Sequence, residues 1–238
     1  MISPCSDPQP PNLGGLNTFI FDLDGTLLDT LDDLAAATNY ALRTHGMPEH
    51  SRDDVRRFVG NGVRLLMERA IPDGAQNPKF EATFQTFREY YLEHSLDRTK
   101  PYDGIMETLT ERHRRGCHLA VVSNKFMTAT QELVHHFFPM IPVAIGENEA
   151  AGIRKKPAPD TVFAALNALH KGTGTLCNGT LCNSYVKAVY VGDSDVDLET
   201  ARNAGLPCVS VLWGFRDRDF LINHGAKTLI SAPHELLG

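Results

Sequence analysis

The sequence predicts an α/β protein: a doubly wound parallel sheet with a Rossmann-like core and a small inserted α-helical domain. After residue 100, short apolar runs alternate with helical patterns, which is typical of βαβ units and a parallel sheet. Before that region, about sixty residues have helical periodicity and contain no good strand. A chain of 238 residues is long enough for a core with a smaller second domain. The predicted parts are a loose tail over 1–15, an α/β core over 16–28 and 96–238, and the helical insertion over 29–95.

The first predicted element is a buried strand over Thr18–Phe21, where the apolar run is of strand length. Asp22 and Asp24 follow at once, with Gly25 and Thr26 behind them. Burying carboxylates beside one another is costly unless a cation or a proton compensates them. The strand end is therefore a candidate site for a cation or a basic group.

The insertion contains three amphipathic segments, at 29–46, 51–71 and 77–97. Gly46 is the expected end of the first helix, and Ser51 with Asp54 forms a helix-start signal for the second. Gly60, Asn61 and Gly62 interrupt the second segment, so it is expected to form two helices. The sequence therefore predicts a helical unit between the first strand and the rest of the sheet.

The remainder of the chain alternates between helices and strands. Asp160 and Asp195 are expected to cap helices, and Gly205 is expected to end one. The predicted helices are 107–116, 128–138, 159–169 and 195–205. The predicted strands are 117–125, 142–145, 187–194 and 207–213, with a last one at 226–230.

Charge and composition limit the classes of function. The net charge of −6 and the absence of a long basic run argue against a nucleic-acid binder. The N-terminus does not resemble a secretory signal, and no apolar stretch is long enough to cross a bilayer. Five scattered cysteines favour reduced thiols over a disulfide scaffold. We therefore expect a cytoplasmic protein, a monomer or homodimer, with no nucleic-acid or membrane partner.

Polar groups converge at the ends of the predicted strands. The first strand ends at Asp22 and Asp24, a second at 123–125 (Ser-Asn-Lys), and a later one at 192–197, which holds Asp193 and Asp197. In a doubly wound sheet, ligands bind beyond the carboxyl ends of the strands. A loop that contains Lys155 and Lys156 is expected to reach the same crevice.

In order and spacing, these four segments resemble the motifs of the haloacid dehalogenase-like superfamily of phosphohydrolases, over about Thr18 to Leu237. The resemblance implies that Asp22 is a nucleophile and Asp24 an acid/base. It also implies that Ser123 binds phosphate and that Lys156 stabilises its charge. Asp193 and Asp197 match the acidic fourth motif.

The resemblance further implies a Mg²⁺-dependent phosphatase that forms an aspartyl phosphate, because a carboxylate nucleophile divides one difficult displacement into two steps. The expected metal ligands are the Asp22 and Asp193 carboxylates and the Asp24 carbonyl, with Asp197 in a supporting role. The backbone amides of Gly25, Thr26 and Asn124 are expected to cradle the phosphate.

The helical insertion has the position of the small cap of this superfamily, which closes over the crevice. Residues 58–70 and 211–226 resemble the cap and C-terminal segment of phosphoglycolate phosphatases, so the expected substrate is the small metabolite 2-phosphoglycolate. Gly60, Asn61, Gly62 and Arg64 are the candidate cap residues for its carboxylate. An equally supported interpretation is that the Gly-Asn-Gly segment only joins two helices.

The sequence leaves open other functions and the role of one duplicated segment. The enzyme could be similar to beta-phosphoglucomutase, or a broad phosphatase of sugar or nucleoside monophosphates, because Asp24 serves both reactions. A binding module without catalysis would require the loss of a motif residue, and none is lost. The duplicated GTLCN at 174–183 is a tolerated surface loop or, less favoured, a metal or redox pair of Cys177 and Cys182.

Overall fold

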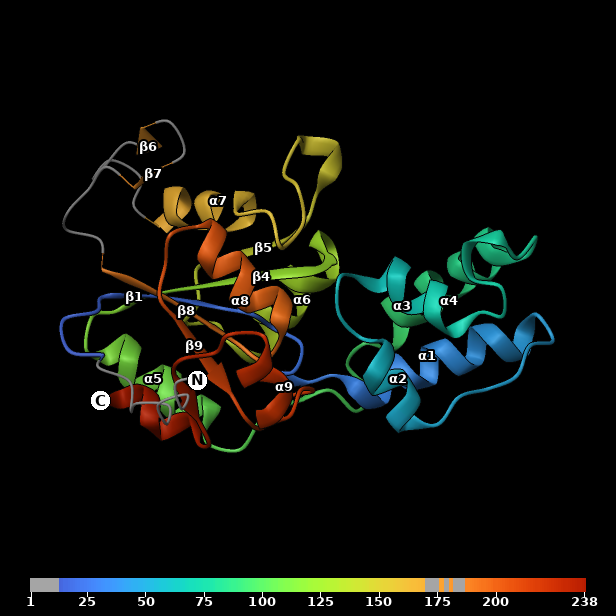
Figure 1. Cartoon of the computed structure of the whole chain (residues 1–238), viewed down its shortest axis with the longest axis horizontal. Helices are drawn as coiled ribbons and strands as arrows, with labels where there is room; N and C mark the ends of the chain where they lie inside the picture. The colour runs from blue at the N-terminus through green and yellow to red at the C-terminus, as the bar shows by residue number, and fades with distance from the viewer. Residues whose placement is uncertain (1–12, 170–175, 178–179, 182–186) are drawn as a thin grey trace, which may run out of the picture.

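A parallel sheet forms the centre of the protein (Figure 1). The structure is a computed structural model that describes residues 13–169, 176–177, 180–181 and 187–238. Within these residues the main sheet has six strands in the order β10-β9-β8-β1-β4-β5, and every neighbouring pair is parallel. The strands are β1 (Thr18–Phe21), β4 (His118–Phe126), β5 (Val143–Glu147), β8 (Ala188–Gly192), β9 (Cys208–Val211) and β10 (Leu229–Ile230). Crossover connections on both sides of β1 confirm the predicted doubly wound fold.

Apolar clusters cover both faces of the sheet, which explains why its strands are almost continuously apolar. Phe19 and Phe21 pack in one cluster with helices α5 (Ile105–Arg114) and α6 (Met127–Phe137). Ile20, which points to the opposite face, packs with α7 (Asp160–Leu169) and α8 (Asp195–Asn203). All four residues of β1 are buried, so this strand holds the residues that follow it in a fixed place.

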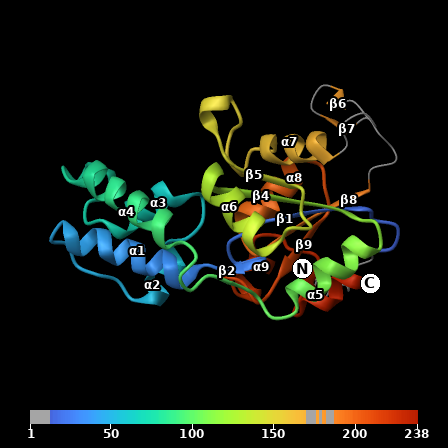
Figure 2. The same cartoon turned by 180° about the vertical axis from the view of Figure 1, so that it is seen from behind.

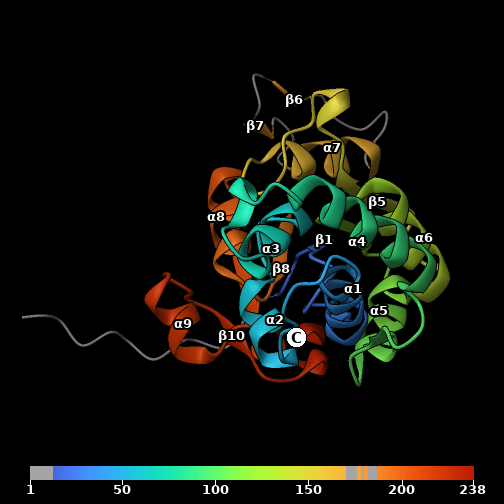
Figure 3. The ribbon, with the colours of Figure 1, turned by 90° about the vertical axis from the view of Figure 1, so that its right-hand side faces the viewer.

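Residues 31–94 form a separate group of helices beside the sheet (Figures 1 and 2). They are α1 (Leu31–Thr44), α2 (Arg52–Phe58), α3 (Val63–Ala70) and α4 (Phe80–His94), with a 3₁₀ turn at Gly74–Gln76. Their apolar faces make a core cluster of their own, which Phe215 joins from outside the group and against which Phe126 of β4 packs. Viewed from that side, the four helices lie in front of the sheet (Figure 3).

Two short strands connect the helical group to the sheet. In the antiparallel pair β2 (Leu28–Asp29) and β3 (Lys100–Pro101), one strand leads into the helices and the other leads back. Asp33 of α1 is buried and accepts hydrogen bonds from the amides of Arg98 and Thr99 and from the Thr99 hydroxyl, at 2.8–3.1 Å. Asp33 therefore joins the start of the helical group to the segment that leads back to the sheet.

Two helix starts differ from the sequence prediction, and one helix was not predicted. Ser51 and Asp54 make the predicted capping box. Ser194, and not Asp195, caps α8, because its side chain and that of Asp197 exchange hydrogen bonds with the backbone. Asp160 is the first residue of α7 instead of its cap, and the carboxylate accepts from Arg154. Helix α9 (Arg218–Asn223), capped by Asp217, was not predicted, because one and a half turns give too short a periodic pattern.

Some of the predictions concern residues that the structure does not describe. Most of the predicted tail and Cys182 lie outside the described residues. In the duplicated segment, β6 (Leu176–Cys177) pairs antiparallel with β7 (Thr180–Leu181). The last described turn is a 3₁₀ helix at Pro233–Leu237. In the described parts of the chain, no helix combines the length and the apolar character that a membrane crossing requires.

Candidate active site

Asp22 and Asp24 lie at the carboxyl end of β1, where the chain turns sharply at Gly25. The Asp22 amide donates to the Val191 carbonyl of β8, which continues the sheet up to the first acid. Gly25 has φ of +86°, and a Cβ atom there would overlap the Asp193 carboxylate and lie 2.9 Å from the Phe215 ring. Only glycine therefore allows the turn and the close approach of Asp193 together.

Lys156 binds the first acid. Its Nζ lies 2.6 Å from Asp22 Oδ1 and 2.8 Å from Asp197 Oδ1, and it donates to the Tyr190 hydroxyl at 3.2 Å. Burial acts to lower the pKa of Lys156, but the Asp197 and Asp22 carboxylates raise it above its usual value. Lys156 is therefore a buried cation beside Asp22.

The position of Lys156 depends on Asn124. The side-chain amide of Asn124 donates to the Lys156 carbonyl at 2.9 Å and accepts from the Lys156 amide at 2.7 Å. These bonds join the end of β4 to the loop between β5 and α7. The amides of Gly25 and Thr26 donate to the Leu28 and Leu23 carbonyls. The phosphate cradle predicted from the Gly25, Thr26 and Asn124 amides stays a prediction.

Asp197 is fully occupied by hydrogen bonds within the protein. Its Oδ1 accepts from Lys156 and the Tyr190 hydroxyl, and its Oδ2 accepts from the amides of Asp193 and Ser194 and from the Ser194 hydroxyl. A carboxylate with this many donors orients its neighbours and has little capacity left for a metal ion.

Asp22 and Asp193 have the character of a cation site. Asp193 Oδ2 accepts from the Phe215 amide at 2.6 Å, while no described group donates to Asp193 Oδ1 or Asp22 Oδ2. Carboxylate oxygens of Asp22, Asp193 and Asp197 lie within 4.8 Å of one another. Burial and the Asp197 charge raise the pKa of Asp193 to about 7 and that of Asp22 well above its usual value. The Asp22 and Asp193 carboxylates thus offer hard oxygen donors in a place with too little positive charge, and such a place suits Mg²⁺.

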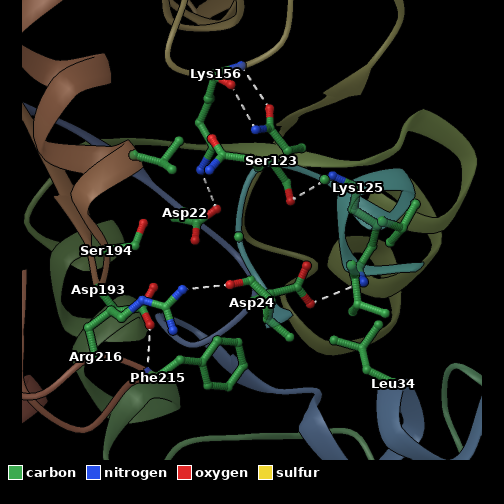
Figure 4. Close-up of a pocket in the computed structure, with 18 residues that line it drawn as sticks. Asp22, Asp24, Leu34, Ser123, Lys125, Lys156, Asp193, Ser194, Phe215 and Arg216 are labelled. Atoms are coloured by element: carbon green, nitrogen blue, oxygen red, sulfur yellow. Dashed lines mark hydrogen bonds and ion pairs between the residues drawn. The ribbon is translucent and has the colours of Figure 1, made fainter. Parts of the chain in front are cut away.

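Ser123 and Lys125 extend the site along β4 (Figure 4). Ser123 is buried, lines the cavity and accepts from the Lys125 amide at 3.2 Å. The Lys125 ammonium lies 3.1 Å from Asp24 Oδ1 and donates to the Tyr91 hydroxyl of α4 at 2.7 Å. Sequence reasoning did not assign Lys125 a role, because a lysine at a strand end usually points to solvent.

One cavity of about 70 Å³ is lined by Asp22, Asp24, Ser123, Asn124, Lys125, Lys156 and Asp193. The room corresponds to about five to seven water molecules. On the side of the helical group it is lined by Gly60, Asn61 and Gly62, and from the loop after β9 by Arg216. All three residues of the Gly-Asn-Gly segment have positive φ, and Gly62 is the N-cap of α3. The segment lies between Arg216, near Gly60, and the Asn124 carbonyl, near Gly62.

Arg216 was not predicted as a site residue. It donates to the carbonyls of Arg56 and Val59 at the end of α2, at 3.3 and 2.6 Å. Its Nε is buried and has no hydrogen-bond partner in the described chain, where no carboxylate forms an ion pair with this guanidinium. A buried N–H donor of a cation without a partner is costly and marks a place where an anion would bind well.

The structure does not bring Arg64 to the cavity. Its guanidinium is 2.5 Å from Glu81 and 3.6 Å from Glu68, and it lies over the Phe80 ring. The side chain is about half exposed on the outer side of α3. Arg64 is close to Gly62 in the chain, but its side chain pairs with Glu81 and does not line the cavity, so the role predicted for it stays a prediction that this geometry does not support.

Comparison with known proteins agrees with this geometry. The model of the haloacid dehalogenase-like hydrolase family matches residues 19–211. A phosphoglycolate phosphatase of Aquifex aeolicus is 33% identical over 206 residues, which are 84% of this chain and 86% of that protein. The N-acetylmuramic acid 6-phosphate phosphatase of Pseudomonas aeruginosa is 28% identical, with 93% of each chain covered.

A solved structure with the same fold comes from Lactobacillus delbrueckii subsp. bulgaricus, and its protein is provisionally named a phosphoglycolate phosphatase. It superposes with a TM-score of 0.82 at 33% identity and covers 93% of this chain and 97% of its own. The family match spans the strands that hold Asp22, Ser123 and Asp193. With the predicted motifs gathered in one cavity of the expected fold, the chain belongs to the haloacid dehalogenase-like hydrolase family.

Proposed function

We propose that this protein is a magnesium-dependent phosphatase of small phosphomonoesters, that Asp22 is its nucleophile, and that its substrate is 2-phosphoglycolate. One observation carries the proposal: two acids share a small cavity, and a separate buried lysine contacts each of them. Such an arrangement gives two carboxylates different tasks, as a nucleophile and an acid/base pair require.

In the first step an Asp22 oxygen attacks phosphorus, and the bond from phosphorus to the ester oxygen breaks. The electron pair of that bond goes to the leaving oxygen, which takes a proton from Asp24. In the second step Asp24 takes a proton from water, and the water oxygen attacks the aspartyl phosphate, releasing phosphate and the Asp22 carboxylate. Both steps require cancellation of negative charge.

Three groups fit the role of metal ligands: the carboxylates of Asp22 and Asp193 and the carbonyl of Asp24. Bound Mg²⁺ would neutralise charge on the transferring phosphoryl group. Lys156 supplies a fixed positive charge beside Asp22, and the Ser123 hydroxyl can donate to a phosphate oxygen. Asp197 holds Lys156 and the Asp193 amide in place.

Residues 29–95 are proposed to act as a cap domain, because α1–α4 have a core cluster of their own and the Gly-Asn-Gly segment between α2 and α3 lines the cavity. In the structure that segment lies against Arg216 and Asn124, and movement about the β2–β3 connection would widen the access to Asp22. Closure would exclude water from the phosphoryl transfer.

A carboxylate on the substrate is supported by Arg216 and by the relatives. The compounds in the names of two relatives, phosphoglycolate and N-acetylmuramic acid 6-phosphate, both contain a phosphate and a carboxylate. The unpartnered Nε of Arg216 and the amides around Gly62 are suitable donors for the second group.

A second candidate is a phosphatase of sugar phosphates, which the muramic acid relative favours. The test is a turnover panel in Mg²⁺ of phosphoglycolate, hexose phosphates, N-acetylmuramic acid 6-phosphate and nucleoside monophosphates. We expect the highest kcat/KM for phosphoglycolate. A higher value for a sugar phosphate would reject the substrate, and interconversion of sugar phosphates without phosphate release would reject hydrolysis.

A further inference from the structure

Lys125 is buried to the same degree as Lys156 and contacts the other acid of the site. It is 2% exposed, at the end of β4. Its Nζ reaches Asp24 Oδ1 at 3.1 Å and the Tyr91 hydroxyl at 2.7 Å, and it lies 4.6 Å from the centre of the Tyr91 ring. Tyr91 comes from α4 and is itself fully buried. Lys125 is thus held by one contact to Asp24, at the end of β1, and by another to Tyr91 of α4.

The two oxygens of Asp24 have different surroundings. Oδ1 accepts from Lys125 and, at 2.6 Å, from the Thr30 hydroxyl. No described group donates to Oδ2, and Asp24 lines the cavity. An oxygen held by two donors has little freedom, whereas one without donors can exchange a proton with a bound reactant.

We propose that Lys125 is a positioning residue for proton transfer. It fixes Asp24 Oδ1, so that Oδ2 faces the leaving oxygen of the substrate, and Tyr91 holds Lys125 in that position. This inference rests on the proposed acid role of Asp24. It adds Lys125 to the residues that serve the reaction and assigns the transferred proton to Oδ2 of Asp24.

Positioning of an acid has a kinetic signature that general damage to the site does not have. An alkyl phosphate such as phosphoglycolate releases a strongly basic alkoxide, which needs a proton as it leaves. Acetyl phosphate has nearly the same size but releases acetate, which needs none. A defect in the acid therefore lowers kcat/KM for the first compound and not for the second, because kcat/KM reports the steps up to departure of the leaving group.

The experiment compares kcat/KM for phosphoglycolate and acetyl phosphate in the wild type, Lys125→Met and Tyr91→Phe. For Lys125→Met we expect a loss on the order of 10–100-fold with phosphoglycolate, because a misplaced acid forfeits part of the roughly 10²–10⁴-fold that acid catalysis contributes. The loss with acetyl phosphate should stay below about threefold. Tyr91→Phe removes one hydroxyl and leaves both charges, so its loss should be smaller but equally selective.

The outcomes separate the inference from the proposed function. Equal losses with both compounds, or no loss with either, would overturn the positioning role. If Lys125→Met does not fold, the selectivity of Tyr91→Phe decides in the same way. Asp24→Asn is the reference: if it shows no selectivity, the acid role of Asp24 fails. If it is selective while Lys125→Met and Tyr91→Phe are not, only the role of Lys125 fails. A different preferred alkyl ester from the substrate panel would replace phosphoglycolate without changing the comparison.

Discussion

Lys156 Nζ lies 2.6 Å from Asp22 Oδ1, and the two residues are 134 positions apart in the chain. The same ammonium is 2.8 Å from Asp197, and all three groups are buried. The lysine therefore offsets a cluster of negative charge that would otherwise be unfavourable in the core.

Replacement of this lysine tests its charge. Lys156→Met is expected to abolish measurable turnover and to lower the free energy of unfolding by about 3–5 kcal/mol, because it leaves two buried carboxylates without their cation. Chemical denaturation and turnover assays measure the two effects. Lys155→Met is the matched control, since no ion pair of the Lys155 side chain occurs in the described chain. Similar stability of the two variants would contradict this role.

A second prediction concerns the turn beneath the site. Gly25→Ala should cost about 2–5 kcal/mol of stability, from the positive φ and from overlap with Asp193 and Phe215. It should also weaken Mg²⁺ binding, measured by calorimetry. Gly46→Ala has a similar φ of +73° but no atom within 4 Å, so it isolates the backbone cost of about 1–2 kcal/mol. Equal losses of stability in Gly25→Ala and Gly46→Ala would show that the close contact between Gly25 and Asp193 does not affect stability.

Stability without metal should depend on pH. The pKa of Asp193 is raised from the usual 3.8 to about 7, and that of Asp22 is raised as well. Between pH 3.8 and about pH 7 the folded protein holds protons that the unfolded chain has lost. The stability of the metal-free protein therefore falls as the pH rises through this range. Mg²⁺ takes the place of the protons, and the increase in Tm that it causes should be larger at pH 8 than at pH 5. Equal increases at both values would contradict the assignment, and Asp193→Asn should reduce the difference.

Arg216 is predicted to recognise the substrate carboxylate. Arg216→Met should raise KM for phosphoglycolate by about 10–100-fold, the effect of one lost hydrogen bond between charged groups. KM for ethyl phosphate, which has no carboxylate, should change little. Arg64→Met is the control, because its guanidinium pairs with Glu81 outside the cavity. A parallel rise for both compounds would show that Arg216 only connects α2 to the core.

The sequence predicted the parts of the site that topology decides. Ser123 lies near the end of β4 and Asp193 directly follows β8, and these two strands flank β1. Because the carboxyl ends of parallel strands meet at one edge, their convergence with Asp22 followed from the strand pattern. The roles of Lys125 and Arg216 depend on contacts with α4 and α2, which no periodic pattern contains. Arg64 shows the same limit. It is close to Gly62 in the chain, but the sequence does not show to which side of α3 its side chain points.

Covalent labelling of Asp22 tests the central proposal most directly. Asp24→Asn should slow hydrolysis of the aspartyl phosphate but still accept the phosphoryl group of acetyl phosphate, which needs no acid. Rapid acid quench of this variant with ³²P-labelled acetyl phosphate and Mg²⁺, followed by peptide mass spectrometry, locates the label. The account predicts a hydroxylamine-sensitive phosphoryl group on Asp22 that is absent from Asp22→Asn. Label on another residue, or turnover without label at any quench time, would contradict it.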